Sequence, residues 1–420
     1  MLSETYQYRQ GSLYCEGVAL ADIARAAGSP CYVYSAAAIR DRYRAYDRAF
    51  GERPHLVCYA VKANSNLSIL ELLAAEGAGF DIVSGGELYR VIAAGADPGK
   101  VVFSGTGKTR EEIDYALETG IHSFNCESWD ELVLIDSLAA RLAKRPSVAF
   151  RVNPDVDAET HRHISTGTKI NKFGIDIDQA REIYSRAMGL ANVAVEGVSC
   201  HIGSQIFKTD RMIEAARHVV ALAADLRAAG VPIRHLDLGG GLGVAYEPGV
   251  EPPAIADYVR SLCEASAAES EAILKLEPGR SITADAGVLL TQVLYRKDTP
   301  SKRFVIVDAS MSELIRPVLY EAHHEILPVR QAPERGTIMA DVVGPVCESG
   351  DFLAQDREVP NAMPRDLLAV CTAGAYGFVQ ASNYNSRPRP AEVLVDADEW
   401  RVIRKRESYA DLVRGEELQR

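Results

Sequence analysis

Apolar runs that favour β structure alternate with amphipathic stretches between residues 55 and 277. Eight runs have the length of buried strands: HLVCYAV (55–61), GFDIV (79–83), KVVFS (100–104), HSFNC (122–126), SVAFRVN (147–153), VEGVSCHI (195–202), HLDL (235–238) and ILKLE (273–277). Between the first two runs, Leu67, Leu70 and Leu73 repeat at helical spacing and predict an apolar helix face. This alternation of strand and helix is typical of parallel sheets built from βα units.

Local signals mark where several of these helices begin and end. Thr109 with Glu112, and Ser128 with Glu131, have the spacing of capping boxes. Helix ends are indicated by Gly77, Gly95, Gly120 and Gly230.

The number of strands favours a closed (β/α)8 barrel, which leaves an open doubly wound sheet as the alternative. After about residue 286 the helical pattern fades and β-like runs dominate, while PCYVYS (30–35) adds a candidate strand near the start. We therefore predict a barrel domain at 36–286. The chain ends, 1–35 and 287–420, should form a second, mostly β domain.

Composition narrows the function classes. With 47% hydrophobic and 25% charged residues the chain can bury a sizeable core, and its net charge of -12 argues against a protein that wraps nucleic acid. No apolar run is long enough to span a bilayer. The N-terminal MLSETYQYRQ lacks the apolar core of a signal peptide, so we expect the eight scattered cysteines to be free thiols in the cytoplasm.

Candidate chemistry follows the predicted strands, where the active face of a barrel is built. Lys62 ends an apolar strand in YAVKAN, where desolvation can make its amine a nucleophile toward an aldehyde, although a lysine that simply reaches water is the alternative. Glu277 in EPGR places a carboxylate at a buried strand end. A pyridinium nitrogen would be a suitable cationic partner, and a structural pair with Arg280 is the alternative.

Two further patterns are open to a functional and to a structural interpretation. The run GGGLG (239–243) offers backbone amides to an anion or forms a tight turn, and His201 covers a cofactor ring or sits in the core.

SGTGKT (104–109) resembles the end of a Walker A loop, but the required earlier glycine is Val102, so a P-loop is excluded. The histidines at 161–163 and 323–324 lack zinc spacing, and we predict no metal site.

Seven motifs in order, YAVKAN, HIGSQ, GGGLG, EPGR, IRPVLY, CESGD and GAYG, resemble the fold type III pyridoxal-phosphate-dependent decarboxylases, within them the branch that acts on diaminopimelate. The resemblance covers about residues 30–405. It implies decarboxylation of meso-2,6-diaminopimelate at its D centre to L-lysine and carbon dioxide, the last step of lysine biosynthesis.

Carried over residue by residue, the resemblance implies that Lys62 holds pyridoxal 5'-phosphate as a Schiff base, Glu277 contacts the pyridine nitrogen and His201 stacks on the ring. The other residues implied to bind the cofactor, most of them at its phosphate end, are Ser204, Gly239, Gly240, Gly241, Pro278, Gly279, Arg280 and Tyr376.

The resemblance also implies how the second amino acid group of the substrate is bound. Arg280 and Arg316 would take the distal carboxylate with the Tyr320 hydroxyl, Glu348 would take the ammonium, and Tyr376 would lie close to the substrate. A site that pairs such polar groups discriminates strongly against analogues that lack them.

Cys347 in CESGD would donate the proton to the α carbon, whereas a lone cysteine is usually a buried small hydrophobe. In this family the segment enters the site from the partner subunit, so a homodimer is implied.

DASMSEL (308–314) departs from the family, which often has a glycine and an amide-bearing residue near Ser310 and Ser312. The polar stretch at 155–170 is a candidate for a mobile lid.

Three other functions share parts of this pattern. Ornithine and arginine decarboxylases handle a substrate without a distal carboxylate, so Arg316 and Glu348 disfavour them. A D-ornithine or D-lysine decarboxylase is harder to separate by sequence. A non-catalytic pyridoxal-phosphate carrier would lack both the β domain and a CESGD-like segment.

Overall fold

The computed structural model describes residues 3–157 and 172–418, and the chain divides into two compact units. The barrel unit comprises residues 40–244 and 252–281. The β unit comprises residues 1–39, 245–251 and 282–420. None of the helices in the described ranges combines the length and apolarity that crossing a bilayer demands.

Eight parallel strands form the barrel unit's sheet: β5 (His55–Ala60), β6 (Gly79–Ile82), β7 (Val101–Phe103), β8 (Ser123–Cys126), β9 (Ser147–Asn153), β11 (Ala194–Ser199), β12 (His235–Asp237) and β13 (Ile273–Leu276). Each pairs with the next, and β13 pairs with β5, with Leu274 opposite His55. The ring is therefore closed. The predicted (β/α)8 barrel is confirmed, and the open sheet is excluded. A two-residue strand, β10 (Ile175–Asp176), pairs in parallel with the end of β9.

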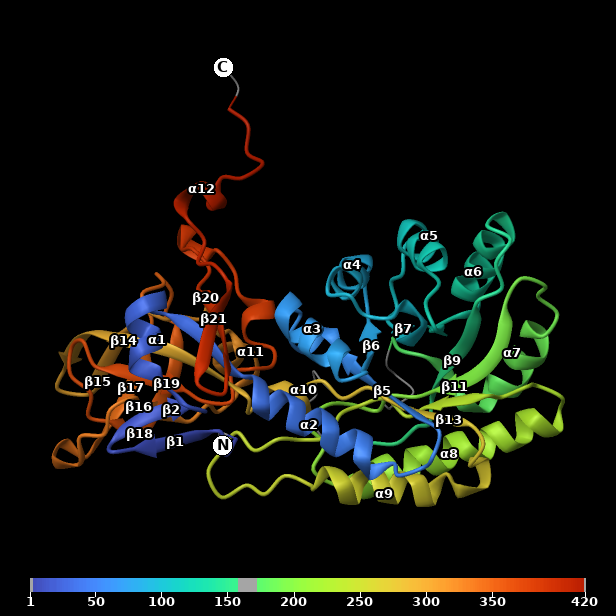
Figure 1. The fold of residues 1–420 in the computed structure, drawn as a ribbon, viewed down its shortest axis with the longest axis horizontal. Helices are drawn as coiled ribbons and strands as arrows, with labels where there is room; N and C mark the ends of the chain where they lie inside the picture. Colours follow the sequence, from blue (N-terminus) through green and yellow to red (C-terminus); the bar gives the residue numbers. More distant parts are fainter. Residues whose placement is uncertain (1–2, 158–171, 419–420) are drawn as a thin grey trace. The chain divides into compact units, whose positions relative to one another are not determined.

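Helices follow the barrel strands in sequence and lie outside the ring (Figure 1): α3 (Leu67–Ala75), α4 (Gly85–Ala93), α5 (Arg110–Thr119), α6 (Trp129–Arg141), α7 (Ala180–Ala187), α8 (Thr209–Ala228) and α9 (Ile255–Ala265). The buried face of α3 differs from the predicted stripe. Leu67 is the first residue of the helix and is 43% exposed, while Ile69, Leu70 and Leu73 are buried. Leu67 lies at the very start of the helix, so helical spacing alone assigned it wrongly to the buried face.

The two predicted capping boxes have different outcomes. Thr109 and Glu112 form the reciprocal pair of hydrogen bonds that defines the box. Ser128 accepts the Glu131 amide at 3.3 Å, but the Glu131 carboxylate instead accepts from Lys108 and from the Glu127 amide. The second box was therefore half right, because a buried lysine competes for the glutamate.

The main sheet of the β unit combines strands from both chain ends. Its order is β18 (Phe352–Pro360), β17 (Thr337–Val343), β15 (Arg303–Val307), β14 (Gly287–Asp298), β4 (Cys31–Ser35), β20 (Ala391–Asp396) and β21 (Glu399–Arg404). The early strand β4 pairs antiparallel with β14 and parallel with β20. The prediction of a mostly β region assembled from both chain ends is confirmed.

Smaller elements complete the β unit. They are the meander β1 (Tyr6–Arg9), β2 (Ser12–Cys15) and β3 (Val18–Ala19), the strands β16 (Ile326–Pro328) and β19 (Leu367–Val370), and the helices α1 (Leu20–Ala27), α11 (Arg316–Tyr320) and α12 (Tyr409–Leu412). Helices α2 (Ala36–Ala49) and α10 (Arg280–Thr283) each contain a boundary between the units. The predicted lid at 155–170, with the histidines at 161 and 163, lies outside the described residues except for its first three positions.

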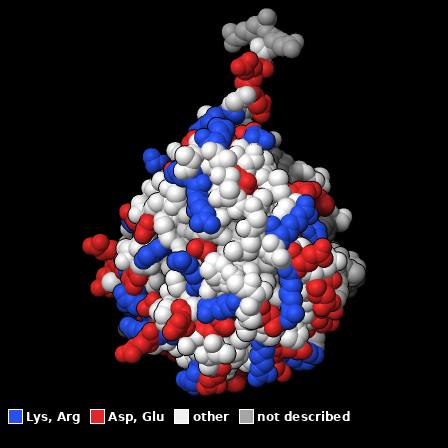
Figure 2. Space-filling view, turned by 90° about the vertical axis from the view of Figure 1, so that its right-hand side faces the viewer, with Lys and Arg blue, Asp and Glu red and all other residues white. Residues whose placement is uncertain are grey.

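Charges of both signs are spread over the surface in view in Figure 2, where Lys and Arg side chains lie interspersed with Asp and Glu. All eight cysteines lie in the described ranges and are free thiols, as predicted; Cys347 is exposed, Cys263 is half-buried and the other six are buried.

Candidate active site

Lys62 lies at the carboxyl end of β5, in a single 3-10 turn formed by Val61–Ala63. Its ammonium forms an ion pair with Asp81 on the neighbouring strand β6. The Asp81 side chain is fully buried, and its Oδ1 has no hydrogen-bond partner among the described residues. The sequence reasoning missed Asp81, although an acid inside the apolar run GFDIV was a signal for it.

Glu277 follows β13 and is 8% exposed. Its Oε1 accepts hydrogen bonds from the Ser104 hydroxyl at 3.3 Å and from the Asn125 amide at 3.4 Å. Burial, followed by the nearby carboxylates Asp237 and Asp81, raises the pKa of Glu277 well above its usual range. The last residue of the EPGR motif, Arg280, contacts Ser204 and not Glu277, so the structural pair of Glu277 with Arg280 does not describe this site.

Asn125 joins the acidic residues at the strand ends. Its amide nitrogen lies 3.0 Å from Oδ2 of Asp237 and 3.1 Å from the Ser104 hydroxyl, in addition to its contact with Glu277. All four side chains are buried. Sequence reasoning missed Asn125 and Asp237; both occupy predicted strands, HSFNC and HLDL, whose polar residues could have been aligned across the barrel.

A buried lysine lies near this cluster, in β13, two residues before Glu277. Lys275 faces Asp237 in the strand register and donates to the Ser123 hydroxyl at 2.9 Å. Burial lowers the pKa of Lys275 to about 8. Because Lys275 and Asp237 both reach residues of β8, the polar residues at 123 and 125 lie inside the barrel.

His201 follows β11 and is held through both its backbone and its ring. Its carbonyl accepts from Arg151 at 3.1 Å, and its Nδ1 accepts the Gly240 amide at 3.2 Å. A ring nitrogen that accepts an N–H is unprotonated, so a neutral His201 carries its proton on Nε2. Burial, aided by Arg151 and Lys62, lowers the pKa of His201 well below its usual range.

Glycines bring the ends of β11, β12 and β13 into close approach. A Cβ at Gly240 would clash with the Glu277 carbonyl, and one at Gly241 would clash with the Gly203 carbonyl. The amides of Gly239 and Gly240 donate to Asp237 and His201, so these two N–H groups serve the barrel itself. Close packing of backbone is therefore what the glycine run provides here.

Arg280 and Ser204 connect two of these loops. The Arg280 Nε and Nη2 lie 3.3 and 3.2 Å from the Ser204 hydroxyl, and Arg280 is 8% exposed. Pro278 accepts the Ala60 amide at 3.0 Å through its carbonyl, and a Cβ at Gly279 would lie 3.0 Å from the Cβ atoms of Ala60 and Ala63. The EPGR turn is thereby packed against the turn that carries Lys62.

These features fit pyridoxal phosphate. The barrel unit presents an amine at Lys62, a buried carboxylate at Glu277 whose contacts include an amide and a hydroxyl, and a guanidinium at Arg280 that can bind an anion. Asp81 Oδ1 and Asn125 Oδ1 are buried without hydrogen-bond partners among the described residues, as expected of a site that awaits a polar ligand.

Lys108, the lysine of the Walker-like SGTGKT, has a structural role. Its side chain is fully buried, and its ammonium donates to the carbonyls of Gly105 at 2.7 Å and Asn125 at 2.9 Å and to Glu131 at 2.6 Å. The exclusion of a P-loop therefore agrees with the geometry, because this lysine joins the loop after β7 to β8 and α6.

In the β unit, Arg316 begins α11 and is 5% exposed. Its guanidinium lies over the Tyr246 ring at 4.3 Å, and its Nη1 is 2.9 Å from His324 Nε2. Tyr320, four residues later in the helix, is partly buried. Sequence reasoning missed His324, which it considered only as a metal ligand.

The CESGD segment forms a turn with an exposed tip. Asp351 accepts the amides of Met311 and Val346, each at 2.7 Å, while Cys347 and Glu348 are exposed. The usual fate of a lone cysteine, burial, is thus excluded for Cys347. Its amide donates to Asn385 Oδ1 at 2.8 Å.

Two further backbone features belong to the predicted motifs. Tyr376 in GAYG has a φ of +55°, an unusual conformation for a non-glycine residue that often marks a functional position. In the divergent DASMSEL segment, the amide and hydroxyl of Ser310 donate to Glu313 at 2.7 and 2.6 Å. Ser310 and Glu313 together therefore shape this turn.

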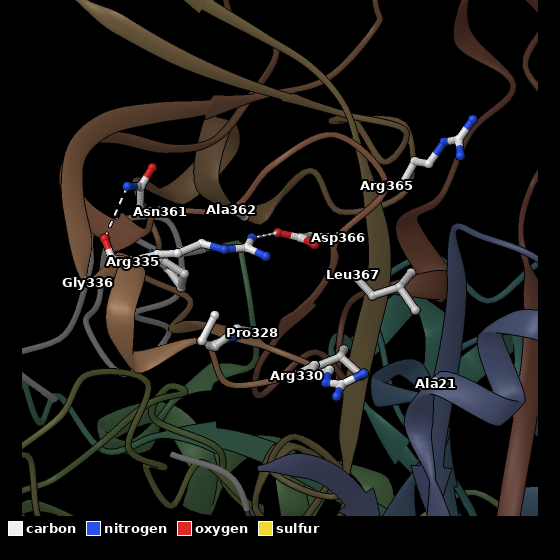
Figure 3. Close-up of a pocket in the computed structure, with 13 residues that line it drawn as sticks. Ala21, Pro328, Arg330, Arg335, Gly336, Asn361, Ala362, Arg365, Asp366 and Leu367 are labelled. Carbon is white, nitrogen blue, oxygen red and sulfur yellow. Dashed lines mark hydrogen bonds and ion pairs between the residues drawn. The ribbon is translucent and has the colours of Figure 1, made fainter.

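A separate pocket of about 250 Å³ lies within the β unit (Figure 3). Its lining includes the ion pair of Arg335 with Asp366, whose atoms are 2.5 Å apart, together with Arg330 and Arg365. It contains none of the predicted site residues.

Comparison with known proteins gives a consistent result. Residues 36–284 match the family model described as pyridoxal-dependent decarboxylase, pyridoxal binding domain. The chain is 54% identical to a diaminopimelate decarboxylase of Pseudomonas aeruginosa over 418 residues, which cover 99% of each chain.

Two solved structures extend the likeness to three dimensions. A diaminopimelate decarboxylase from Helicobacter pylori complexed with L-lysine is 43% identical, with a TM-score of 0.90 over 94% of this chain and 98% of that one. One from M. jannaschii, in co-complex with L-lysine, is 38% identical, with a TM-score of 0.95 over 100% and 99%.

Proposed function

The chain belongs to the pyridoxal-dependent decarboxylase family, and from this membership we propose that it converts meso-2,6-diaminopimelate to L-lysine and carbon dioxide. It is a carboxy-lyase that uses pyridoxal 5'-phosphate, and its product places it at the last step of lysine biosynthesis. The observation that carries this function is identity of 43 to 54% to diaminopimelate decarboxylases over essentially the whole chain, both units included.

In our proposal Lys62 holds the cofactor aldehyde through its amine, and Glu277 faces the pyridine nitrogen. When bound, pyridoxal phosphate supplies an electron sink for the pair released as the bond to the carboxylate breaks. A buried Glu277, held by Ser104 and Asn125, is well placed to keep a ring nitrogen protonated, since a cation relieves the cost of burying its charge. His201, neutral and fixed by Gly240, would present its ring to the cofactor.

The phosphate end is assigned to the loops after β11, β12 and β13. Ser204 and Arg280 already contact each other there, and the glycine run lets the backbone approach closely. The other residues that we assign to the cofactor in these loops are Gly239, Gly240, Gly241, Pro278 and Gly279, and Tyr376 of the β unit is assigned to it as well. A guanidinium with a hydroxyl at hydrogen-bond distance is a suitable arrangement for a phosphate.

For the substrate, we assign the distal carboxylate to Arg280, Arg316 and Tyr320, with Tyr376 nearby, and the distal ammonium to Glu348. The buried guanidinium of Arg316 supports this assignment, because little water competes for it. An analogue without the distal carboxylate would leave that charge unpaired, which favours diaminopimelate over simple diamino acids.

We assign proton donation at the α carbon to the Cys347 thiol, and we propose that it acts in the site of a second copy of the chain. Its support is exposure: Cys347 and Glu348 lie at the tip of a turn that Asp351 holds in place. The unit of function would then be a homodimer. We place the protein in the cytoplasm, where its eight free thiols would remain reduced.

Product analysis tests the reaction. Purified protein with pyridoxal phosphate and meso-diaminopimelate should release carbon dioxide and L-lysine in equal amounts. D-lysine consumed faster than meso-diaminopimelate, or no L-lysine formed, would contradict the assignment.

A mixing experiment tests the shared site. Inactive Lys62→Ala and Cys347→Ala variants, unfolded and refolded together, should regain about a quarter of wild-type activity, because random pairing gives mixed dimers with one intact site. Wild-type protein unfolded and refolded in the same way is the control and should regain its activity. If the control recovers and the mixed variants do not, the shared site is contradicted.

A further inference from the structure

A buried histidine, His324, contacts the guanidinium of Arg316. His324 is fully buried, with its Nδ1 2.8 Å from the Cys371 carbonyl and its Nε2 2.9 Å from Arg316 Nη1. A carbonyl only accepts hydrogen bonds, so Nδ1 carries the proton, and a guanidinium only donates, so Nε2 accepts. Both contacts require the same neutral tautomer.

The backbone around His324 is itself fixed. The chain turns back after α11 through Glu321, which has a φ of +52°, and the Cys371 amide donates to the Glu325 carbonyl at 2.8 Å. Together with the bond from His324 to Cys371, this ties the histidine to the end of β19. The position of the ring is therefore set by contacts other than the one with Arg316.

Aromatic packing fixes the same pair from another side. Tyr246 meets the His324 ring edge to face, with centroids 5.2 Å apart, and lies beneath the Arg316 guanidinium. Burial, followed by the charge of Arg316, lowers the pKa of His324 well below its usual range. The imidazole therefore remains an acceptor for Arg316 and does not become a competing cation.

We infer that His324 is a positioning residue for substrate recognition: its Nε2 orients Arg316 toward the distal carboxylate that distinguishes diaminopimelate from simple diamines. This inference rests on the proposed function, since it takes the carboxylate from the proposed substrate. It adds a residue that does not touch substrate but sets the direction of one that does.

Two substitutions separate the two hydrogen bonds of the ring. In His324→Gln the side-chain oxygen can reach the position of Nε2 and accept from Arg316. In His324→Asn the shorter amide can occupy the position of Nδ1 and donate to Cys371, but it falls short of Arg316. Both variants lose the ring packed on Tyr246, so their difference reports the contact with Arg316.

The readout is the affinity of the holoenzyme for each of two ligands. It is measured from the visible absorbance of bound pyridoxal phosphate. L-Lysine retains the distal carboxylate of the substrate, and cadaverine has the same carbon chain without it. His324→Asn should weaken the affinity for L-lysine about tenfold or more, which is the effect of losing one hydrogen bond to a charged group. Its affinity for cadaverine should stay unchanged. His324→Gln should bind L-lysine within about threefold of wild type.

His323→Gln is the matched control, because His323 contacts Glu325 at 3.2 Å and Arg357 at 3.1 Å. It should leave both affinities unchanged. Equal effects of His324→Asn and His324→Gln, or equal weakening of L-lysine and cadaverine, would indicate a purely structural role and overturn the inference. The proposed function fails separately, if wild-type protein forms no L-lysine from meso-diaminopimelate.

Discussion

Lys62 and Asp81 form an ion pair in which the carboxylate is fully buried while the lysine side chain is 37% exposed. The pair joins the ends of β5 and β6, which are adjacent parallel strands of the barrel. It means that the proposed cofactor lysine has a charged partner before any cofactor binds, and that removing the lysine leaves a buried charge behind.

Lys62→Ala should therefore destabilise the apoprotein as well as abolish cofactor attachment. We expect a loss of about 1 to 2 kcal/mol, less than for a fully buried pair because Lys62 is partly exposed. Adding Asp81→Asn should restore most of this loss, since the uncompensated charge is then gone. Urea unfolding of the single-variant and double-variant apoproteins measures their free energies of unfolding. A double variant no more stable than Lys62→Ala would contradict the pairing.

Glu277→Gln should stabilise the apoprotein at neutral pH while it impairs catalysis. Folding raises the pKa of Glu277, so its contribution to stability is full below the unfolded carboxyl pKa of about 4.3 and is lost as the pH rises through the folded value. Glutamine does not ionise, so the variant does not lose this stability as the pH rises. We expect a gain of about 1 kcal/mol at pH 8, the scale of burying an unpaired polar group.

The gain from Glu277→Gln should shrink toward pH 4, where the carboxyl of the wild-type apoprotein is protonated in both states. Decarboxylation by the reconstituted variant should fall about a hundredfold, because an amide supports a protonated ring nitrogen less well. A stability difference that is the same at pH 4 and pH 8 would argue against this account.

Cys347→Ala should lower kcat by about 10²- to 10³-fold, the usual contribution of a positioned acid, and leave L-lysine affinity nearly unchanged. Cys263→Ala, which removes a half-buried thiol from α9, serves as the control and should retain full activity. Steady-state kinetics with meso-diaminopimelate decide it. A Cys347→Ala enzyme with normal kcat would remove the thiol from the reaction.

Lys108→Met should cost about 3 kcal/mol of stability, because it leaves the Glu131 carboxylate, only 10% exposed, without its cation. Lys144→Met is a suitable control: Lys144 makes one exposed bond, to the Glu118 carbonyl at 3.3 Å. Thermal unfolding of both variants gives the comparison. Equal Tm values for the two would contradict a structural role for Lys108.

Much of the fold follows from local pattern. Each barrel strand is a short apolar run that must be buried on both faces, so its position is fixed by its own composition and by the polar residues that end it. Lys62, His201 and Glu277 lie at the carboxyl ends of such runs, and a parallel barrel gathers these strand ends on one face. Their grouping was therefore predictable once eight strands were counted.

The contacts that tune those residues were not predictable. Asp81, Asn125 and Asp237 lie inside strands, and sequence alone does not say which buried polar side chains meet across a barrel. Their meeting depends on strand register and on which face each side chain occupies, and a shift of one residue would reverse both.

The sequence by itself determined the barrel, the place of Lys62 at the end of its first strand and the order of the motifs, because these depend on local composition and on chain order. Only the tertiary structure decided that Lys108 binds Glu131 of α6, that Glu277 is held by Asn125 and Ser104, and that His324 contacts Arg316. Hydrogen bonds between residues distant in sequence require a particular packing, and a low-dielectric interior then gives each of them its weight.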